Sequence, residues 1–212
     1  MTQHDSKAIA EIHHELHSHL PPEPALRAKA LESLLVEKGM VDAAAVDAWV
    51  DAYADDIGPK NGARVVARSW VDPDFLARLR EDAGAAVTEL GYQQAHLVAV
   101  ENSDEVHNLV VCTLCSCYPT GLLGMPPAWY KMAAYRARAV REPRSVLEEF
   151  GVTLSPDTTL KVWDSTAELR YLVVPQRPAG TDGWDEARLA ALVSRNAMIG
   201  TQRELAANVG AR

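Results

Sequence analysis

Three cysteines, Cys112, Cys115 and Cys117, lie within six residues of one another in the stretch VCTLCSC. The 212-residue chain contains no other cysteine, so all of its thiols are in this cysteine loop (residues 112–117). Thiolates are soft ligands that bind hard cations such as magnesium and calcium poorly. Such close spacing therefore indicates either a site for a softer metal ion or a redox site.

Three common uses of clustered cysteines fit the spacing poorly. A disulfide between Cys115 and Cys117 would have to join alpha carbons nearly 7 Å apart in an extended chain, with badly directed side chains. A structural zinc site takes four side-chain ligands, and only His107 is close enough in sequence to be the fourth. A thioredoxin-like pair begins a helix, and neither Cys117 nor Pro119 suits that position.

Backbone nitrogen atoms offer a further option. Cys115 and Cys117 can hold one ion from either side of Ser116, and the amide nitrogens of Ser116 and Cys117 lie between the two sulfur atoms. Deprotonated, these amides would complete a square of two nitrogens and two sulfurs, with Cys112 on one axial side. Such strong donors suit trivalent cobalt or iron, and an open sixth position on a Lewis acid suits hydration chemistry.

The overall composition argues against two other classes of protein. A formal net charge of -8 does not favour a nucleic-acid-binding protein, which usually carries a basic patch. There is one small basic cluster, Arg136, Arg138 and Arg141. We interpret it as the side of a helix that faces solvent or another subunit. No apolar run is long enough for a transmembrane helix, and the N-terminus does not look like a secretory signal. We expect a cytoplasmic protein with no membrane partner.

Composition shifts divide the chain into four segments. Residues 1–23 hold five of the seven histidines and are expected to form a disordered tail, with metal storage as the alternative. Residues 24–69 are predicted to be a helical arm that packs on a partner subunit, with GPKNGA as a turn near its end. Residues 70–203 form the metal-binding catalytic domain, and residues 204–212 a C-terminal tail.

The catalytic domain is predicted to mix helices and strands. One helix is expected over DPDFLARLREDAGAAVTELG, and strands over HLVAVEN and VHNLVVC, joined by the SDE turn. The cysteine loop follows the second of these strands directly. Helices are expected over PPAWYKMAAYRARAV and PRSVLEEFG. TLKVWDS and ELRYLVVP are expected to form a second strand pair, followed by a helix over GWDEARLAALVSRNAMIG.

Several motifs together resemble the alpha subunit of nitrile hydratase, of the cobalt type. They are VHNLVVCTLCSCYP, GPKNGARVVARSWVDP and KVWDSTAELRYLVVPQRPAGTDGW, and the resemblance extends from about Ala25 to Gly200. Thr113 is the cobalt signature of this family, whereas the iron type carries serine there. The resemblance implies an α+β fold, a layered α-β-β-α domain preceded by a helical N-terminal arm.

The resemblance also implies a particular metal centre. A non-corrin cobalt(III) ion, or less readily iron, would be bound by the thiols of Cys112, Cys115 and Cys117 and by the amides of Ser116 and Cys117. Cys115 would mature to a sulfinic acid and Cys117 to a sulfenic acid. Arginines of a beta subunit would hold the added oxygen atoms, so this chain alone would be inactive.

The implied reaction converts a nitrile into the corresponding amide. The sulfenate oxygen on Cys117 would attack the nitrile carbon or activate a water that does. The implied partners are a beta subunit, as one chain or split into two, and a factor that inserts cobalt. The assembled enzyme would be a heterodimer or a higher oligomer.

Several residues outside the loop match supporting positions in relatives. Gln93 corresponds to a glutamine near the metal, with an ordinary loop residue as the alternative. Asp164 and Glu168 match acidic positions around the ligands, with turn stabilisation or a salt bridge to Arg170 as the alternative.

The substrate pocket is the least constrained part. Tyr118 and Trp129 either line this pocket or pack in the core. Relatives commonly read CYPWPVLGLPP after the cysteines, whereas this chain reads CYPTGLLGMPP, with Thr120 and Gly121 in place of tryptophan and proline. A larger pocket, for bulkier aromatic or heterocyclic nitriles, is the resulting hypothesis.

Two rival functions remain open. Thiocyanate hydrolase shares VCTLCSCYP and also uses cobalt on a carbon–nitrogen triple bond. A non-catalytic metal-binding or redox-sensing protein would use the thiols without oxidising them permanently.

Overall fold

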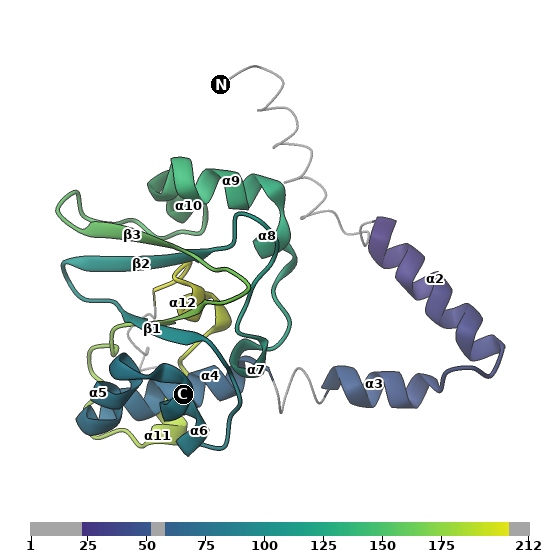
Figure 1. Ribbon diagram of the computed structural model, residues 1–212, viewed down its shortest axis with the longest axis horizontal. Coiled ribbons are helices and arrows are strands. Elements are labelled where there is room, and N and C mark those ends of the chain that lie inside the picture. Colours follow the sequence, from purple (N-terminus) through teal and green to yellow (C-terminus); the bar gives the residue numbers. More distant parts are fainter. Residues whose placement is uncertain (1–22, 52–57, 204–212) are drawn as a thin grey trace. The chain divides into compact units, whose positions relative to one another are not determined.

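The computed structural model describes residues 23–51 and 58–203 (Figure 1). Contacts divide the chain into two units, Met1–Asp51 and Ala52–Arg212. The expected histidine-rich tail, apart from Glu23, and the expected C-terminal tail lie outside the described residues. No helix in the described ranges is long and apolar enough to cross a membrane.

The described part of the first unit, residues 23–51, contains helices α2 (Glu23–Glu37) and α3 (Ala43–Asp51). Asp42 caps the start of α3, because its Oδ1 accepts a hydrogen bond of 2.9 Å from the backbone nitrogen of Ala44. α2 buries none of its residues.

The second unit begins with α4 (Pro59–Val71), where a turn over GPKNGA was predicted. That prediction is wrong, because Pro59 occupies the first turn of the helix, where its missing N–H costs nothing. Gly62 is buried, and a Cβ there would come within 2.6 Å of Leu123 and 2.7 Å of Met198. Glycine at position 62 thus permits close packing of α4. Because α4 lies in the second unit, the expected arm (24–69) includes residues of both units.

Three long predicted helices are each divided in two. α5 (Pro73–Glu81) and α6 (Ala83–Glu89) are separated by Asp82, which has extended backbone angles and accepts a hydrogen bond from Ala85 N. The other two predicted helices form the pairs α8 (Ala128–Lys131) with α9 (Ala133–Arg141), and α11 (Glu186–Ala190) with α12 (Arg195–Ile199). Capping side chains or extended residues thus end helices that periodicity alone would continue.

The four strands in the described ranges form two parallel pairs, not the expected neighbouring pairs. β1 (Leu97–Glu101) pairs with β4 (Arg170–Val174), and β2 (Val106–Val111) pairs with β3 (Thr159–Asp164). Parallel strands need long crossover connections. Helices α7 (Thr120–Leu123), α8, α9 and α10 (Pro143–Glu149) supply the crossover between β2 and β3.

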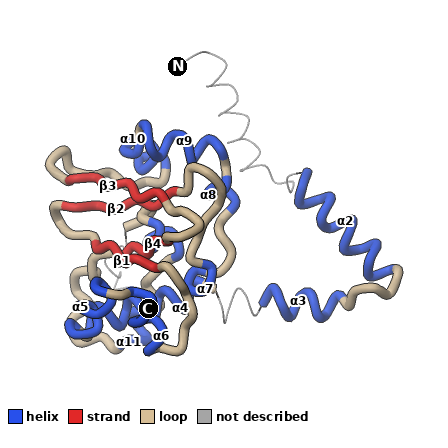
Figure 2. Tube along the Cα trace, viewed as in Figure 1, coloured by secondary structure: helices blue, strands red, loops and turns tan. Residues whose placement is uncertain are grey.

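Helices cover both sides of the strand pairs, which confirms the layered α-β-β-α arrangement (Figures 1 and 2). α4, α5, α6 and α11 lie beyond β1, whereas α9 and α10 lie beyond β2 and β3. The two sheets also contact one another through β2 and β4, so that both contribute to one core of buried residues, including Leu109, Val111 and Leu172.

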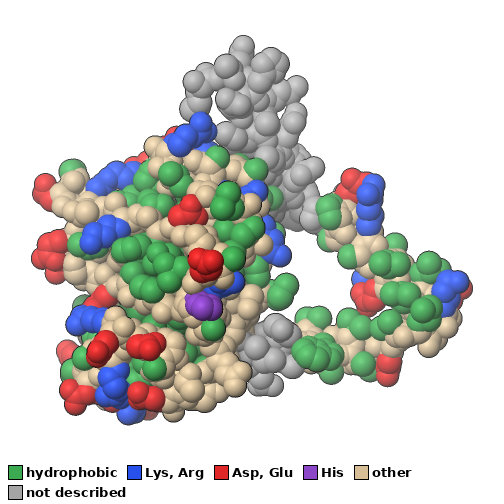
Figure 3. Space-filling view, viewed as in Figure 1, with side chains coloured by type: hydrophobic (Ala, Val, Ile, Leu, Met, Phe, Trp, Pro, Cys, Tyr) green, Lys and Arg blue, Asp and Glu red, His purple; other side chains and the backbone are tan. Residues whose placement is uncertain are grey.

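Charged side chains of both signs are spread over the visible face of this unit. In Figure 3, lysine and arginine are interspersed with aspartate and glutamate. This distribution agrees with the acidic composition and shows no broad basic stripe on that face.

Candidate metal centre

Parallel pairing of β2 and β3 places the cysteine loop beside an acidic residue. Val111 is the last residue of β2, and its partner in the register is Asp164, the last residue of β3. Because both strands run in the same direction, their carboxyl ends lie at one edge. Cys112 follows β2 at that edge and is completely buried.

The loop brings its three sulfur atoms together. The distance between the sulfur atoms is 3.4 Å from Cys112 to Cys115 and 3.0 Å from Cys115 to Cys117. Within the described ranges, these three side chains are the only group of three or more histidine, cysteine or acidic residues close enough to share an ion. A site with four side-chain ligands is therefore not formed by this part of the chain.

Hydrogen bonds make the thiols unequal. Hydrogen bonds to Cys117 and Cys112 lower the pKa of the Cys115 thiol to about 7, and the backbone amides of Cys117 and Ser116 contribute to the same shift. Burial, followed by its hydrogen bond with Cys115, raises the pKa of the Cys117 thiol to about 12. Cys115 is exposed and Cys117 is half-buried, so Cys115 is the most accessible thiolate.

In metal-free protein, Cys115 should react with iodoacetamide before the other two cysteines. The alkylation rate should rise with pH and reach half its maximum near pH 7, because the thiolate is the nucleophile and the pKa of Cys115 is about 7. Timed alkylation from about pH 5 to about pH 9, followed by peptide mass spectrometry, measures this. Earlier labelling of Cys117 would contradict the expected order.

Thr113 is tied to Asp164 by two hydrogen bonds. Its backbone nitrogen donates to Asp164 Oδ1 at 2.9 Å, and its hydroxyl donates to Oδ2 at 2.6 Å. Both groups of one residue thus engage both oxygens of one carboxylate. The result is that the end of β3 fixes the start of the cysteine loop.

Two carbonyl groups of the loop are held from the following helices. The Tyr130 hydroxyl donates to the Cys117 oxygen at 2.9 Å, and Arg136 Nη1 donates to the Cys115 oxygen at 2.9 Å. Sequence reasoning missed Tyr130 and assigned Arg136 to a solvated or subunit-facing basic cluster. The available signal was that the helical segment PPAWYKMAAYRARAV begins soon after the loop.

His107 does not join the cysteines. It is fully buried on β2, and its Nε2 donates a 2.7 Å hydrogen bond to the Gly200 oxygen. Burial lowers the pKa of His107 and favours the neutral ring. The zinc site that would have used this histidine is therefore not formed.

The donor atoms fit the metal set expected from the spacing. Three sulfur atoms converge, and the amides of Ser116 and Cys117 lie close enough to the Cys115 thiol to help lower its pKa. Two backbone nitrogens thus accompany three sulfurs, a set that suits a small, strongly bound transition-metal ion.

Comparison with known proteins assigns the family. The family model described as nitrile hydratase, alpha chain, matches residues 22–202. The low-molecular weight cobalt-containing nitrile hydratase subunit alpha of Rhodococcus rhodochrous is 54% identical over 181 residues, which cover 84% of this chain and 87% of that protein. The chain belongs to the nitrile hydratase alpha-chain family. An Fe-type nitrile hydratase of Comamonas testosteroni, solved as a double mutant, shares its fold with a TM-score of 0.74 and 42% identity, covering 89% of this chain and 93% of that one.

The rival family is also similar, but less so. The thiocyanate hydrolase subunit gamma of Thiobacillus thioparus is 40% identical over 185 residues, covering 81% of this chain and 76% of that protein. Both relatives therefore match the region that contains the cysteine loop, and the higher identity lies with the nitrile hydratase alpha chain.

The remaining residues predicted from the nitrile hydratase resemblance are placed unevenly. Gln93 is exposed. Its backbone carbonyl oxygen lies so close to Gly121 that a Cβ atom added to Gly121 would overlap this oxygen. Gln94 Oε1 accepts a 3.1 Å hydrogen bond from the Gly121 nitrogen. Glu168 is exposed in the turn after β3, and Arg170 bonds to the carbonyl groups of Thr166 and Ala167 instead of to Glu168.

The three expected pocket residues differ in their surroundings. Tyr118 is buried and makes an edge contact with the ring of Tyr130 at 5.2 Å. Trp129 is half-buried, and its ring lies 4.8 Å from those of both Tyr135 and Phe150. Thr120 is exposed at the start of α7. Trp129 and Tyr118 thus pack against other aromatic rings, whereas Thr120 faces the surface of this chain.

Proposed function

We propose that this chain is the metal-bearing alpha subunit of a cobalt-containing nitrile hydratase, which converts nitriles into amides. The observation that carries the proposal is the convergence of three sulfur atoms in a loop whose chain is 54% identical to a cobalt-containing relative. Cys112, Cys115 and Cys117 hold the cobalt(III) ion together with the amide nitrogens of Ser116 and Cys117. When bound, the ion supplies a Lewis acid that activates the nitrile or water.

The exposure of the thiols supports the proposed pattern of cysteine oxidation. Susceptibility to oxidation follows thiolate character and access. Cys115 is exposed and has the lowered pKa, Cys117 is half-buried, and Cys112 is buried. The proposed products of oxidation by dioxygen follow the order of exposure: sulfinic acid at Cys115, sulfenic acid at Cys117, and an unmodified thiolate at Cys112.

Cys117 then acts on the substrate through its sulfenate oxygen. This oxygen either attacks the nitrile carbon, whose nitrogen takes up the electron pair and a proton before water displaces the sulfenate, or accepts a proton from the water that attacks the carbon. Tyr130 donates a hydrogen bond to the carbonyl group of Cys117, and so helps fix the position of the sulfenate oxygen on the same residue. Gln93 is proposed to orient the substrate or the attacking water.

A beta subunit, as one chain or two, is proposed to cover the cysteine loop in a heterodimer or higher oligomer. Leu114 lies in that loop with 86% of its surface exposed, which is costly for an apolar side chain unless a partner covers it. Exposed Leu31 and Leu34 on α2 support the proposal that the N-terminal arm packs on a partner. A cobalt-insertion factor and a cytoplasmic location complete the proposal.

The proposal is tested on the chain co-expressed with its beta subunit in cobalt-containing medium. We expect about one cobalt per chain that resists a chelator, and amide formation from a nitrile. Zinc, or metal that the chelator removes easily, would point to a structural or sensing site. Faster turnover of thiocyanate than of nitriles would instead support the second candidate, thiocyanate hydrolase, which the 40% identity to its gamma subunit keeps in consideration.

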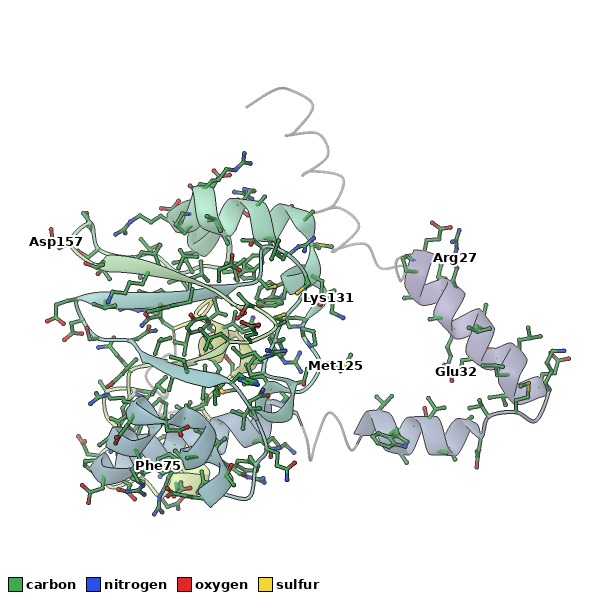
Figure 4. The ribbon with its side chains drawn as sticks, in the orientation of Figure 1. Arg27, Glu32, Phe75, Met125, Lys131 and Asp157 are labelled. Atoms are coloured by element: carbon green, nitrogen blue, oxygen red, sulfur yellow. The ribbon has the colours of Figure 1, made fainter. Side chains whose placement is uncertain are left out.

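Replacing Asp164 by asparagine should reduce the cobalt content and kcat by roughly 10-fold or more, since residues that orient metal ligands typically contribute about that much. Asparagine offers one acceptor oxygen where the carboxylate gives two to Thr113. Asp157→Asn is the matched control, because Asp157 lies beyond the opposite end of β3 (Figure 4). Equal cobalt content and kcat in the two variants would contradict a role for Asp164 in the loop.

Replacing Thr120 by tryptophan should lower kcat/KM for bulky nitriles more than for small ones. The difference between 3-cyanopyridine and acetonitrile should be on the order of 10-fold, the size of effect that a change in pocket volume produces. Thr120→Val, which adds no bulk, should leave the ratio of the two kcat/KM values unchanged. Equal losses on both substrates in Thr120→Trp would rule out the hypothesis of an enlarged pocket.

A further inference from the structure

We propose that Arg136 is a positioning residue that orients the Cys115–Ser116 peptide toward the metal and balances the negative charge that this peptide takes up. The inference rests on the proposed function, because it requires the Ser116 nitrogen to be a metal ligand. It assigns a role to a residue of this chain, separate from the arginines of the beta subunit.

Arg136 holds one peptide group of the cysteine loop. Arg136 Nη1 donates a 2.9 Å hydrogen bond to the Cys115 carbonyl oxygen. That oxygen belongs to the same planar unit as the Ser116 nitrogen, and in a trans peptide the two atoms point in opposite directions. Holding the oxygen on Arg136 therefore directs the nitrogen away from α9. The Ser116 amide is close enough to the Cys115 thiol to help lower the pKa of that thiol.

The same peptide group becomes negatively charged when its nitrogen binds a metal ion. When the Ser116 nitrogen binds as an anionic ligand, its proton leaves to water and no electron is transferred. Resonance across the peptide bond then shares the negative charge with the Cys115 oxygen. A guanidinium donor at that oxygen makes a charge-assisted hydrogen bond, which is stronger than a bond from a neutral donor.

Arg136 forms no ion pair with another residue in the described ranges. Arg138, on the same helix, is paired with Glu142 and Glu149. No described carboxylate forms an ion pair with Arg136, and its buried Nε has no hydrogen-bond partner among those residues. A half-buried cation without a carboxylate is costly unless an anion lies nearby. The loaded cysteine loop is such an anion.

The neighbouring contact provides an internal comparison. Tyr130, a neutral donor, holds the Cys117 oxygen, whose peptide partner is the nitrogen of Tyr118. That nitrogen is not among the proposed ligands. The charged donor is thus on the peptide that carries a ligand nitrogen, and the neutral donor is on one that does not.

Arg136→Gln tests the proposal, because glutamine can still donate a hydrogen bond but carries no charge. The variant is co-expressed with the beta subunit, and three properties are measured: cobalt per chain, the rate of cobalt release to a chelator, and the visible absorption of the centre. Arg141→Gln is the matched control, since Arg141 is exposed in the last turn of the same helix. Circular dichroism and thermal melting show whether each variant is folded.

We expect Arg136→Gln to release cobalt roughly 10- to 100-fold faster than Arg141→Gln, the usual effect of removing a partner of a metal ligand. Its absorption bands should also shift, because the donor strength of the Ser116 nitrogen changes. Release rate and spectrum equal to those of the control would overturn the inference while leaving the proposed function intact. Wild-type protein that binds no cobalt would instead overturn the proposed function, and the inference with it.

If Arg136→Gln does not fold, Arg136→Lys is compared with Arg141→Lys. Lysine keeps the charge but replaces the planar guanidinium with a single ammonium group, so the peptide is oriented less firmly. We expect cobalt release several-fold faster than in Arg141→Lys, with a shifted spectrum. Identical behaviour of the two lysine variants would overturn the inference.

Discussion

Replacing Cys112 by serine is expected to abolish cobalt binding and to lower nitrile hydration by roughly 1,000-fold or more, a greater loss than changes to residues that merely orient ligands produce. Cys112 is completely buried at the end of β2, where its sulfur lies 3.4 Å from that of Cys115. Serine would substitute a hard hydroxyl, which is rarely deprotonated, for a soft thiolate. Within the described ranges no other histidine, cysteine or acidic side chain joins this group to replace it.

Elemental analysis and the rate of amide formation in the co-expressed complex measure this loss. Ser116→Ala provides the contrast, because the proposed ligand at position 116 is the backbone nitrogen, which alanine retains. We expect Ser116→Ala to bind about one cobalt per chain, as the unmodified chain does. If Cys112→Ser retained its cobalt, or if Ser116→Ala lost it, the ligand set would be wrong.

Replacing Gly200 by alanine should lower the free energy of unfolding by about 3 kcal/mol or more, from a steric overlap together with an unfavourable backbone conformation. Gly200 ends α12 in the left-handed region, with φ +90°. A Cβ at this position would overlap the carbonyl oxygen of Asn108 and lie 2.9 Å from its carbonyl carbon. Backbone atoms of β2 cannot easily move away, and the Gly200 oxygen also accepts the hydrogen bond of His107.

Gly151→Ala separates the overlap from the backbone conformation. Gly151 has φ +79°, but a Cβ added there would meet no atom within 4 Å, so alanine should cost only about 1 kcal/mol. Urea denaturation of both variants gives the two free energies. Equal losses would show that the contact between α12 and β2 does not constrain position 200.

The ligand set was the part of the site most accessible from sequence. Cys112, Cys115 and Cys117 are close neighbours in the chain, so their spacing already limits which donors can share an ion. The hydrogen bonds that hold the cysteine loop in place join residues that are far apart in the sequence. Asp164 reaches Thr113 across 51 residues only because β2 and β3 pair in parallel. The valine-rich strands were predictable, but which strand pairs with which depends on the packing of the crossover helices.

Helix boundaries and the role of Arg136 were missed for a similar reason. GPKNGA has the composition of a turn, yet Gly62 is helical, and its lack of a side chain leaves room for Leu123 and Met198, which approach it closely. Arg136 and Arg138 are two residues apart on one helix, and composition treats them alike. One bonds to the cysteine loop and the other to two glutamates. These differences arise from tertiary contacts, which single-sequence periodicity does not contain.

The most direct test of the account is X-ray absorption at the cobalt edge of the complex purified with its beta subunit. Three sulfur neighbours and two nitrogen neighbours around cobalt are predicted, from the thiols of Cys112, Cys115 and Cys117 and the amides of Ser116 and Cys117. A shell of four sulfurs, or one containing only nitrogen and oxygen, would contradict the proposed centre.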